Sequence, residues 1–508
     1  MDIQEFKDFA GASIEYIADY CENIRNVSTK CCTWLSKQST TQTSSQKRRA
    51  LEFLDGRHRQ NNSSGINTMA FSILPCLLSN RTVLSCHRRR TLYGRHRRCC
   101  HGLGLLRYVI KERKFLKEFL FQKSSPAVVE LEVRVMDWLA KILGLPEEFL
   151  NCSEGPGGGL IQSAASESTL VGILSAKYKK IQQLKTEGTP FLDWEVEGRL
   201  VAYTSNESNS SVEKSGLITS VKMRLLPTDS KGSLRGNVLH EAIRNDKEHG
   251  LIPFCVVASL GTTGTCAMDN LEEIGQICTD EKMWLHIDAA YAGTALACPE
   301  YRYLLKGIEY VDSFNFNPHK WMLVNGDCSA MWFRNCKFVE EAFKAKATLK
   351  VPVFEPELEH RQIPDVRRFR ALKLWFVIRI YGVQGIQNHV RHQIGLATYL
   401  EELVKADKRF EVVISTLGVV CFQLLKEDSV THAILERIAK RKNIYIMPYY
   451  YKGQLLFRFV VCSRFTQKED IDKSWSEILS QTNEVLKDLK DESIKCKEID
   501  GMIETSPV

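Results

Sequence analysis

Residues 311–321 read VDSFNFNPHKW, and this stretch decides the fold that the sequence predicts. Its first six residues predict a strand that ends at Phe316. Pro318 restricts the backbone after the strand, so Lys320 is held just beyond the strand end. A lysine held in this way can present its amine to a carbonyl group.

On both sides of this stretch, short apolar strands alternate with helical patterns. The alternation predicts an α/β fold with a large, mixed or mainly parallel sheet. The expected strands are 200–203, 252–260 and 284–287, and the expected helices are 128–143, 238–246 and 271–278.

A second, smaller α/β lobe is expected towards the C-terminus. A helix begins near residues 370–381, and the expected strands after it are 419–424, 444–448 and 455–461. The predicted organisation is an N-terminal helix (1–26), an irregular basic segment (27–123), a large domain (124–378), a small C-terminal domain (379–490) and a tail (491–508).

The composition indicates a globular protein. The 508 residues are 44% hydrophobic and 26% charged. The sequence contains no run of eighteen apolar residues, so it predicts no membrane-spanning helix. The 17 cysteines are odd in number and scattered, and they form no paired Cys-x-x-Cys units. The first residues of the chain are acidic, whereas a secretory signal begins with basic residues. We therefore expect a reduced, cytoplasmic protein without a metal site.

The net charge of +8 comes from one segment. Residues 27–123 hold 20 Lys and Arg but 4 Asp and Glu, so the rest of the chain is acidic. A nucleic-acid-binding arm is one interpretation of this segment. Its arginines, however, lie among Leu, Cys and Gly without an element that would enter a groove, so we expect no nucleic-acid partner.

A second chemical signal lies in residues 284–293, which read WLHIDAAYAG. Asp288 ends an apolar strand, 32 residues before Lys320, and small residues follow it. An Asp and a Lys at separate strand ends match what pyridoxal phosphate requires, since the Lys binds its aldehyde and the Asp keeps its ring nitrogen protonated.

A third signal combines glycines with small hydroxyl residues. Residues 155–159 read GPGGG, and residues 163–167 read SAASE at the start of a helix, where backbone N–H groups can bind a phosphate. Thr262 and Thr263 could add a hydroxyl.

Each signal also has a simpler interpretation when it is considered alone. Asp288 would be a strand-end cap, Lys320 a surface lysine and the glycines a loop. Their combination favours a cofactor site.

With these residues in view, the chain resembles the group II pyridoxal-phosphate amino-acid decarboxylases, specifically the aromatic-L-amino-acid decarboxylase family. The resemblance covers residues 1–26 and about 124–490, and residues 312–321 and 325–330 carry it most specifically. It implies the aspartate-aminotransferase-like fold of pyridoxal-phosphate enzymes (fold type I), and a homodimer with the active site near the subunit interface.

The resemblance also implies roles for individual residues. Lys320 would be the Schiff-base lysine and Asp288 the partner of the pyridine nitrogen. Matches to phosphate-binding positions are Ala165, Ser166, Asn317 and His319; Thr263 matches a cofactor-site threonine, and Ala290 would pack on the ring.

Asn209 departs from the family pattern and points to a branch. Family decarboxylases place a histidine over the cofactor ring at this position. An amide is smaller than an imidazole and does not titrate near neutrality. With Asn209 at this position, the chain resembles the insect 3,4-dihydroxyphenylacetaldehyde synthases. This resemblance implies decarboxylation of L-dopa with dioxygen as co-substrate. The implied products are an aldehyde, ammonia and hydrogen peroxide. A substitution without functional consequence is the alternative.

Two further departures concern the pocket. The family's mobile loop carries a proton-donating tyrosine, but the stretch 343–350 is shortened here, and no tyrosine occurs between Tyr310 and Tyr381. This loss disfavours amine formation or indicates an impaired enzyme. Val366 stands where a small residue is usual and would narrow the substrate pocket.

The segment 27–123 also lacks the family's substrate-binding stretch, which is rich in Trp, His, Tyr and Pro. Met69 and Ala70 are encoded by ATG followed by G, so the frame shifted by one nucleotide contains a tryptophan codon here. With permitted codons, that frame can read WHSPYYHAYYPTAQSYP through Ser85. We interpret the segment as partly a frameshifted translation.

These observations predict a pyridoxal-phosphate-dependent carboxy-lyase that acts on aromatic L-amino acids and releases an aldehyde. An ordinary aromatic-L-amino-acid decarboxylase that releases the amine is the first alternative. A catalytically impaired cofactor-binding homologue is the second.

Overall fold

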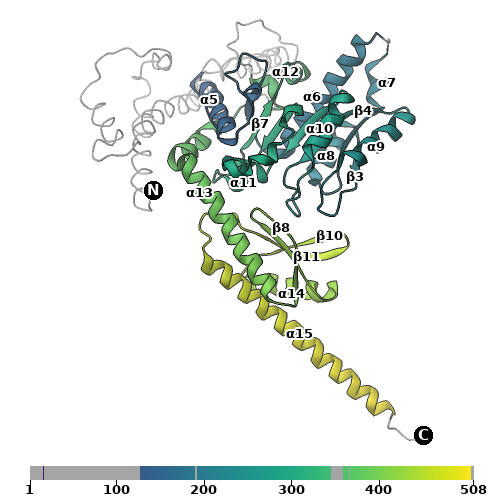
Figure 1. The fold of residues 1–508 in the computed structure, drawn as a ribbon, viewed down its shortest axis with the longest axis vertical. Helices are drawn as coiled ribbons and strands as arrows, with labels where there is room; N and C mark the ends of the chain where they lie inside the picture. The colour runs from purple at the N-terminus through teal and green to yellow at the C-terminus, as the bar shows by residue number, and fades with distance from the viewer. Residues whose placement is uncertain (1–14, 16–125, 189–190, 345–357, 365–366, 505–508) are drawn as a thin grey trace, which may run out of the picture. The chain divides into compact units, whose positions relative to one another are not determined.

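The computed structural model describes residues 15, 126–188, 191–344, 358–364 and 367–504. The chain divides into two compact units, residues 1–135 with 352–379 and residues 136–351 with 380–508. The predicted helix 1–26 and the basic segment 27–123 lie outside the described residues, apart from Glu15. The second unit holds both sheets and most of the helices (Figure 1).

A seven-stranded mixed sheet forms the centre of the second unit. Its strand order is β1-β7-β6-β5-β4-β2-β3; the pairs from β3 to β6 are parallel, and β7 pairs antiparallel with β6 and β1. The strands are β1 (Gly158–Gln162), β2 (Leu200–Ser205), β3 (Lys222–Leu226), β4 (Ile252–Ser259), β5 (Trp284–Asp288), β6 (Ser313–Phe316) and β7 (Ser329–Phe333).

The inner strands are buried on both faces. Every residue of β2, β5, β6 and β7 is buried, as expected for strands that helices cover on both sides. The helices of this region are α5 (Pro126–Leu143), α6 (Ala165–Thr186), α7 (Asp193–Glu197), α8 (Ser210–Thr219), α9 (Gly236–Glu248), α10 (Leu271–Asp280), α11 (Pro318–Trp321) and α12 (Lys337–Phe343). Short 3-10 helices are η2 (Glu147–Phe149), η3 (Ala292–Ala297), η4 (Pro299–Leu305) and η5 (Ile308–Tyr310).

The predicted α/β fold is confirmed, with shifts at element ends. The strand expected at 311–316 begins at Ser313, and the strand expected at 444–448 begins at Met447. Sequence patterns missed β1, β3, β7 and β8. The glycine run 155–159 was expected as a loop, but its last two residues open β1.

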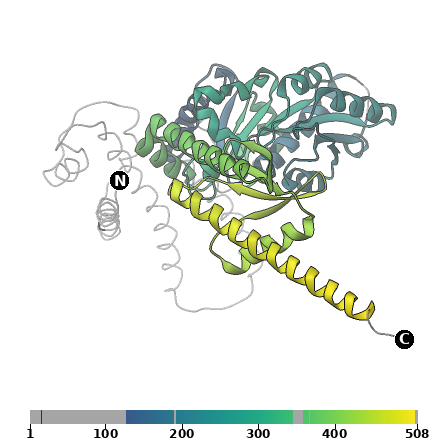
Figure 2. The same ribbon diagram turned by 60° about the horizontal axis from the view of Figure 1, so that its bottom comes forward.

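A four-stranded antiparallel sheet follows, in the order β10-β11-β9-β8. Its strands are β8 (Phe410–Thr416), β9 (Val419–Leu424), β10 (Met447–Tyr451) and β11 (Gln454–Val460), and its helices are α13 (Arg370–Ala406), α14 (Asp428–Arg441) and α15 (Lys468–Glu504). Helix α13 crosses the expected domain boundary at 378/379 and has a non-helical residue at Gly382 (φ 63°, ψ 177°). Helix α15 covers most of the expected tail and extends past the sheet (Figure 2).

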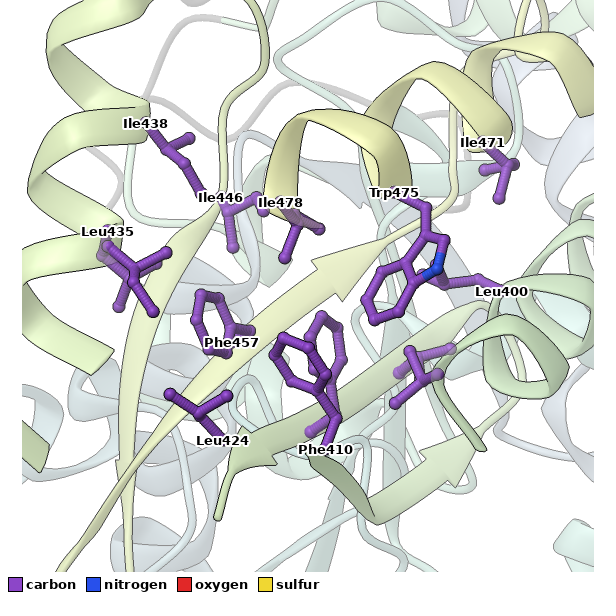
Figure 3. Close-up of a cluster of buried hydrophobic side chains, with 14 of the residues drawn as sticks. Leu400, Phe410, Leu424, Leu435, Ile438, Ile446, Phe457, Ile471, Trp475 and Ile478 are labelled. Atoms are coloured by element: carbon purple, nitrogen blue, oxygen red, sulfur yellow. The ribbon is translucent and has the colours of Figure 1, made fainter. Parts of the chain in front are cut away.

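The two faces of the four-stranded sheet have different partners. On one face, Phe410, Phe422 and Phe457 pack with Trp475 of α15 and with side chains of α13 and α14 (Figure 3). On the other face, Val419, Cys421 and Leu456 pack against Cys266 and Ala292 of the larger sheet's loops. The alternation of side chains along each strand produces both faces.

The other unit includes the start of α5, up to residue 135, and there a buried ion pair joins two described segments. Arg367 donates to Glu132 of α5 and to the side-chain oxygen of Gln362. The same guanidinium donates to the carbonyl of Leu358 in η6 (Leu358–Arg361). Val366, expected to narrow the substrate pocket, lies outside the described residues.

Two further properties of the described residues concern membrane crossing and the state of the cysteines. None of the helices within these ranges is both long enough and apolar enough to cross a membrane. Nine cysteines, the first being Cys152 and the last Cys462, are free thiols.

Candidate active site

A cavity of about 450 Å³ opens where β4, β5 and β6 end. Ligands of open α/β sheets bind at these carboxyl ends. The lining residues come from the start of α6, from the segments after β2, β4, β5 and β6, and from β11; they are Ala164, Ala165, Ser166, Asn209, Ser211, Ser259, Gly261, Thr262, Thr263, Asp288, Ala290, Tyr291, Asn317, His319, Lys320 and Arg458.

The cavity brings together all nine residues to which the resemblance assigns a place at the cofactor. They come from four loops and one helix start that are up to 155 residues apart, between Ala165 and Lys320. The parallel pairing of β4, β5 and β6 explains this convergence, because it directs the ends of all three strands to the same edge.

The two carboxylate oxygens of Asp288 differ in their hydrogen bonds. Its Oδ1 accepts hydrogen bonds from the backbone N–H of Ala290 (3.0 Å) and from Nδ2 of Asn315 (3.3 Å). Its Oδ2 receives none from any residue that the structure describes. Asp288 is 6% exposed. The carboxylate is therefore fixed through one oxygen and offers the other to the cavity.

The amine of Lys320 faces the same cavity. Solvent reaches its side chain through the open mouth, but the protein atoms around the amine lower its pKa. The negative charge of Asp288 opposes this effect, and the positive charge of Arg458 adds to it. A lowered pKa increases the share of neutral amine, which is the form that attacks a carbonyl.

Asn209 is held at both ends of its amide. Its Oδ1 caps α8 by accepting the N–H of Ser211 (2.9 Å), and its Nδ2 donates to Oγ1 of Thr263 (2.7 Å). Both partners also line the cavity. The amide thus forms part of the cavity wall in a fixed orientation.

The start of α6 contributes to the lining of the cavity. Ala165 and Ser166 begin this 22-residue helix, whose first N–H groups have no partner within the helix. His319 also lines the cavity, and its Nδ1 lies against the backbone of Cys328. Oδ1 of Asn317 is buried without a hydrogen-bond partner among the described residues, which leaves it available to a ligand.

The glycine run 155–159 does not take part, so this expectation is wrong. None of its residues lines the cavity. A Cβ on Gly157 would lie 1.8 Å from the carbonyl oxygen of Glu148, and a Cβ on Gly159 would lie 2.3 Å from Cδ1 of Trp332. These glycines permit close packing of β1 rather than phosphate binding.

Sequence patterns missed several lining residues. Arg458 lies on β11 and donates through Nε to the carbonyl of Gly264 (2.8 Å), next to Thr263. Tyr291 stacks on Trp321 with ring centroids 4.9 Å apart. No sequence signal marks Arg458, since it sits in an ordinary strand pattern 138 residues after Lys320. Tyr291 follows Asp288 in the stretch already singled out.

Comparison with known proteins gives a consistent result. Residues 116–425 match the model of the pyridoxal-dependent decarboxylase conserved domain. The chain is 48% identical over 367 residues to 3,4-dihydroxyphenylacetaldehyde synthase of Aedes aegypti, covering 71% of this chain and 70% of that protein. It is 47% identical over 364 residues to aromatic-L-amino-acid decarboxylase of Manduca sexta, covering 70% and 71%.

Solved structures share the fold. The Oryza sativa TDC with PLP and tryptamine has a TM-score of 0.69 at 26% identity, covering 95% of this chain and 99% of that chain. The 4-hydroxyphenylacetaldehyde synthase of Rhodiola rosea has a TM-score of 0.67 at 26% identity, with the same coverage.

Proposed function

Because the chain belongs to the pyridoxal-dependent decarboxylase family, we propose that it converts an aromatic L-amino acid, with L-dopa favoured, to the arylacetaldehyde. The balanced reaction consumes one O₂ and one water per amino acid. It releases CO₂, ammonia and H₂O₂ beside the aldehyde. Dioxygen is the oxidant and is reduced to peroxide.

The residues of the cavity fit pyridoxal phosphate. Lys320 would bond to the aldehyde carbon, and Oδ2 of Asp288, which has no other described partner, would accept the ring N–H. The N–H groups at the start of α6, with Ser166, would bind the phosphate. When bound, this cofactor draws electrons from the bond that the carboxylate leaves.

The observation that carries the aldehyde proposal is the pairing of Asn209 with Thr263. The amide is engaged at both ends and does not titrate near neutrality, so this wall of the cavity holds no acid that could deliver a proton. A positioned general acid typically speeds protonation by about 10²–10⁴-fold. Without one, dioxygen has time to react at the electron-rich carbon.

The sequence identity to known proteins does not discriminate between release of the aldehyde and release of the amine. The Aedes aegypti aldehyde synthase and the Manduca sexta decarboxylase are almost equally identical to this chain. Amine release is therefore the second candidate function. The local chemistry at Asn209 favours the aldehyde.

The test supplies L-dopa and measures O₂ uptake, CO₂, amine, aldehyde and peroxide together. It uses the chain as written and a version with the shifted frame restored within residues 27–123. We expect O₂ uptake and aldehyde in near-equal amounts. Release of CO₂ and amine in equal amounts, without O₂ uptake, would establish the plain decarboxylase.

Two variants sharpen this test. Asn209→His introduces an imidazole and should raise the share of amine at least about tenfold. Asn209→Ser is the matched control, because it keeps the cap of α8 but adds no acid. It should keep the aldehyde as the main product.

The proposal includes a cytoplasmic homodimer. Light scattering of the purified chain should give about twice its mass of 58.0 kDa. A mass of one chain would contradict the dimer and leave the reaction to be judged by its products.

A further inference from the structure

We propose that a chain of buried hydrogen bonds from Trp284 to Asp288 fixes Asp288 against the cofactor ring nitrogen, with His286 as the central positioning residue. The inference rests on the proposed placement of pyridoxal phosphate. It concerns residues behind the cavity, none of which lines it except Asp288.

The register of two strands aligns these side chains. In the parallel pair β5–β6, His286 lies opposite Ser313 and Asp288 lies opposite Asn315. Since side chains alternate along a strand, these four residues share one face of the sheet. All four are buried, with exposures of 0% for three of them and 6% for Asp288.

The first links favour one tautomer of His286. Nε1 of Trp284 donates to Oγ of Ser313 (2.8 Å), and this hydroxyl lies 2.7 Å from Nδ1 of His286. Trp284 is only a donor, so the hydroxyl proton of Ser313 is available to Nδ1. With Nδ1 as acceptor, the neutral imidazole carries its proton on Nε2.

The next link joins two atoms that lack other partners. Nε2 of His286 and Oδ1 of Asn315 are both buried without a hydrogen bond of ordinary geometry to a described residue. The imidazole nevertheless interacts with Asn315, whose side chain raises the pKa of His286. One atom is a donor and the other an acceptor, so we pair them. Nδ2 of the same amide donates to Asp288 (3.3 Å).

His286 is neutral at physiological pH. Burial lowers its pKa to about 4, although the charge of Asp288 acts in the opposite direction. A protonated His286 would compete with the ring nitrogen for the charge of Asp288. The neutral imidazole instead orients Asn315 and leaves the carboxylate charge for the cavity.

A glycine in the covering helix makes room for the imidazole. Gly172 lies in the interior of α6, where glycine is about 0.5–1 kcal/mol less favourable than alanine. A Cβ at this position would lie 3.1 Å from Nδ1 of His286. The helix therefore accepts an unfavourable residue where the imidazole approaches it.

The test uses pyridoxal phosphate labelled with ¹⁵N at the ring and measures the ring-nitrogen chemical shift and the Kd of the cofactor. The parent should hold a protonated ring nitrogen. His286→Leu removes the donor to Asn315 and should move the shift toward the unprotonated value and weaken binding roughly tenfold. His286→Gln keeps an N–H at the position of Nε2 and should retain the parent's shift.

Ile287→Ala is the packing control, since Ile287 is fully buried on the opposite face of β5. It should lower the urea midpoint without moving the ring-nitrogen shift. An unchanged shift and Kd in His286→Leu, or an equal change in Ile287→Ala, would overturn the proposal.

If His286→Leu fails to fold, a second pair of variants still tests the positioning role. Gly172→Ala crowds the imidazole, whereas Gly395→Ala, inside α13, meets no atom within 4 Å. Only Gly172→Ala should move the ring-nitrogen shift; equal shifts in both variants would contradict the positioning role. These readouts do not depend on the product, so the aldehyde proposal can fail while this one holds.

Discussion

Asp288 and Lys320 reach one cavity from the ends of two neighbouring strands, β5 and β6. In the proposed placement of pyridoxal phosphate, Asp288 would act on the ring nitrogen and Lys320 on the aldehyde carbon. Because the two roles are separate, the two residues can be tested separately.

Lys320→Ala should abolish covalent attachment of the cofactor. The parent should be yellow, and borohydride should fix the cofactor to the protein through Lys320. The variant should bind pyridoxal phosphate only reversibly, as mass spectrometry after reduction would reveal. Reducible attachment that survives in the variant would refute the role of Lys320.

Asp288→Asn should separate activity from stability. Asparagine keeps a side-chain oxygen for the N–H groups of Ala290 and Asn315 but lacks the charge. Because charge stabilisation at a reacting site is typically worth about 10²–10³-fold in kcat, we expect a loss of this order. The urea midpoint should change little. Parallel losses of activity and stability would count against the role.

At the scale of elements, β1 depends on the absence of a side chain at Gly159. A Cβ there would lie 2.3 Å from Trp332 and 2.8 Å from Cε of Met136. Gly159→Ala should therefore destabilise the fold by about 1–3 kcal/mol, as overpacking does. Gly326→Ala, where a Cβ would meet nothing within 4 Å, is the control for urea unfolding. Equal midpoints in both variants would disprove the packing role.

The sequence predicted those elements whose pattern is local. Strands β4 and β5 are largely apolar, and in β6 phenylalanine alternates with Ser313 and Asn315. Chemically distinctive residues stand at or after the ends of β5 and β6, so both these strands and Asp288 or Lys320 could be identified. Strand β3 is a five-residue edge strand with Lys222 and Arg224 among its apolar residues, and β1 begins with two glycines, so neither has a clear strand pattern. These two strands form because each pairs with a neighbouring strand of the sheet.

Long-range contacts also explain what the site analysis missed. Arg458 reaches the cavity only because β11 packs against the loop that holds Gly264 and Thr263. The chain Trp284–Ser313–His286–Asn315 depends on the register of β5 and β6, which a single strand's sequence does not specify.

At the scale of the whole molecule, the buried His286 makes stability depend on pH. Its pKa is about 4 in the folded state and near 6.5 in the unfolded chain, so the unfolded state binds more protons between these values. Its contribution to stability is complete above pH 6.5 and is lost as the pH falls toward 4. Between pH 6.5 and 5 this loss is about 2 kcal/mol.

His286→Gln should remove this part of the pH dependence. Urea midpoints measured at pH 5 and pH 7 should differ less in the variant than in the parent. An equal difference in both proteins would show that His286 titrates normally.

The cap that Asn209 provides for α8 has a consequence for how the chemistry of this fold can change. Asparagine is among the best residues at the start of a helix, and replacing such a cap by a residue that cannot cap costs about 0.5–2 kcal/mol. Histidine and asparagine codons differ by one nucleotide. A single mutation from histidine to asparagine here would remove an imidazole from the cavity and tighten a helix start together. Under the aldehyde proposal, a lineage would thus acquire an oxygen-consuming reaction through a step that selection for stability also favours.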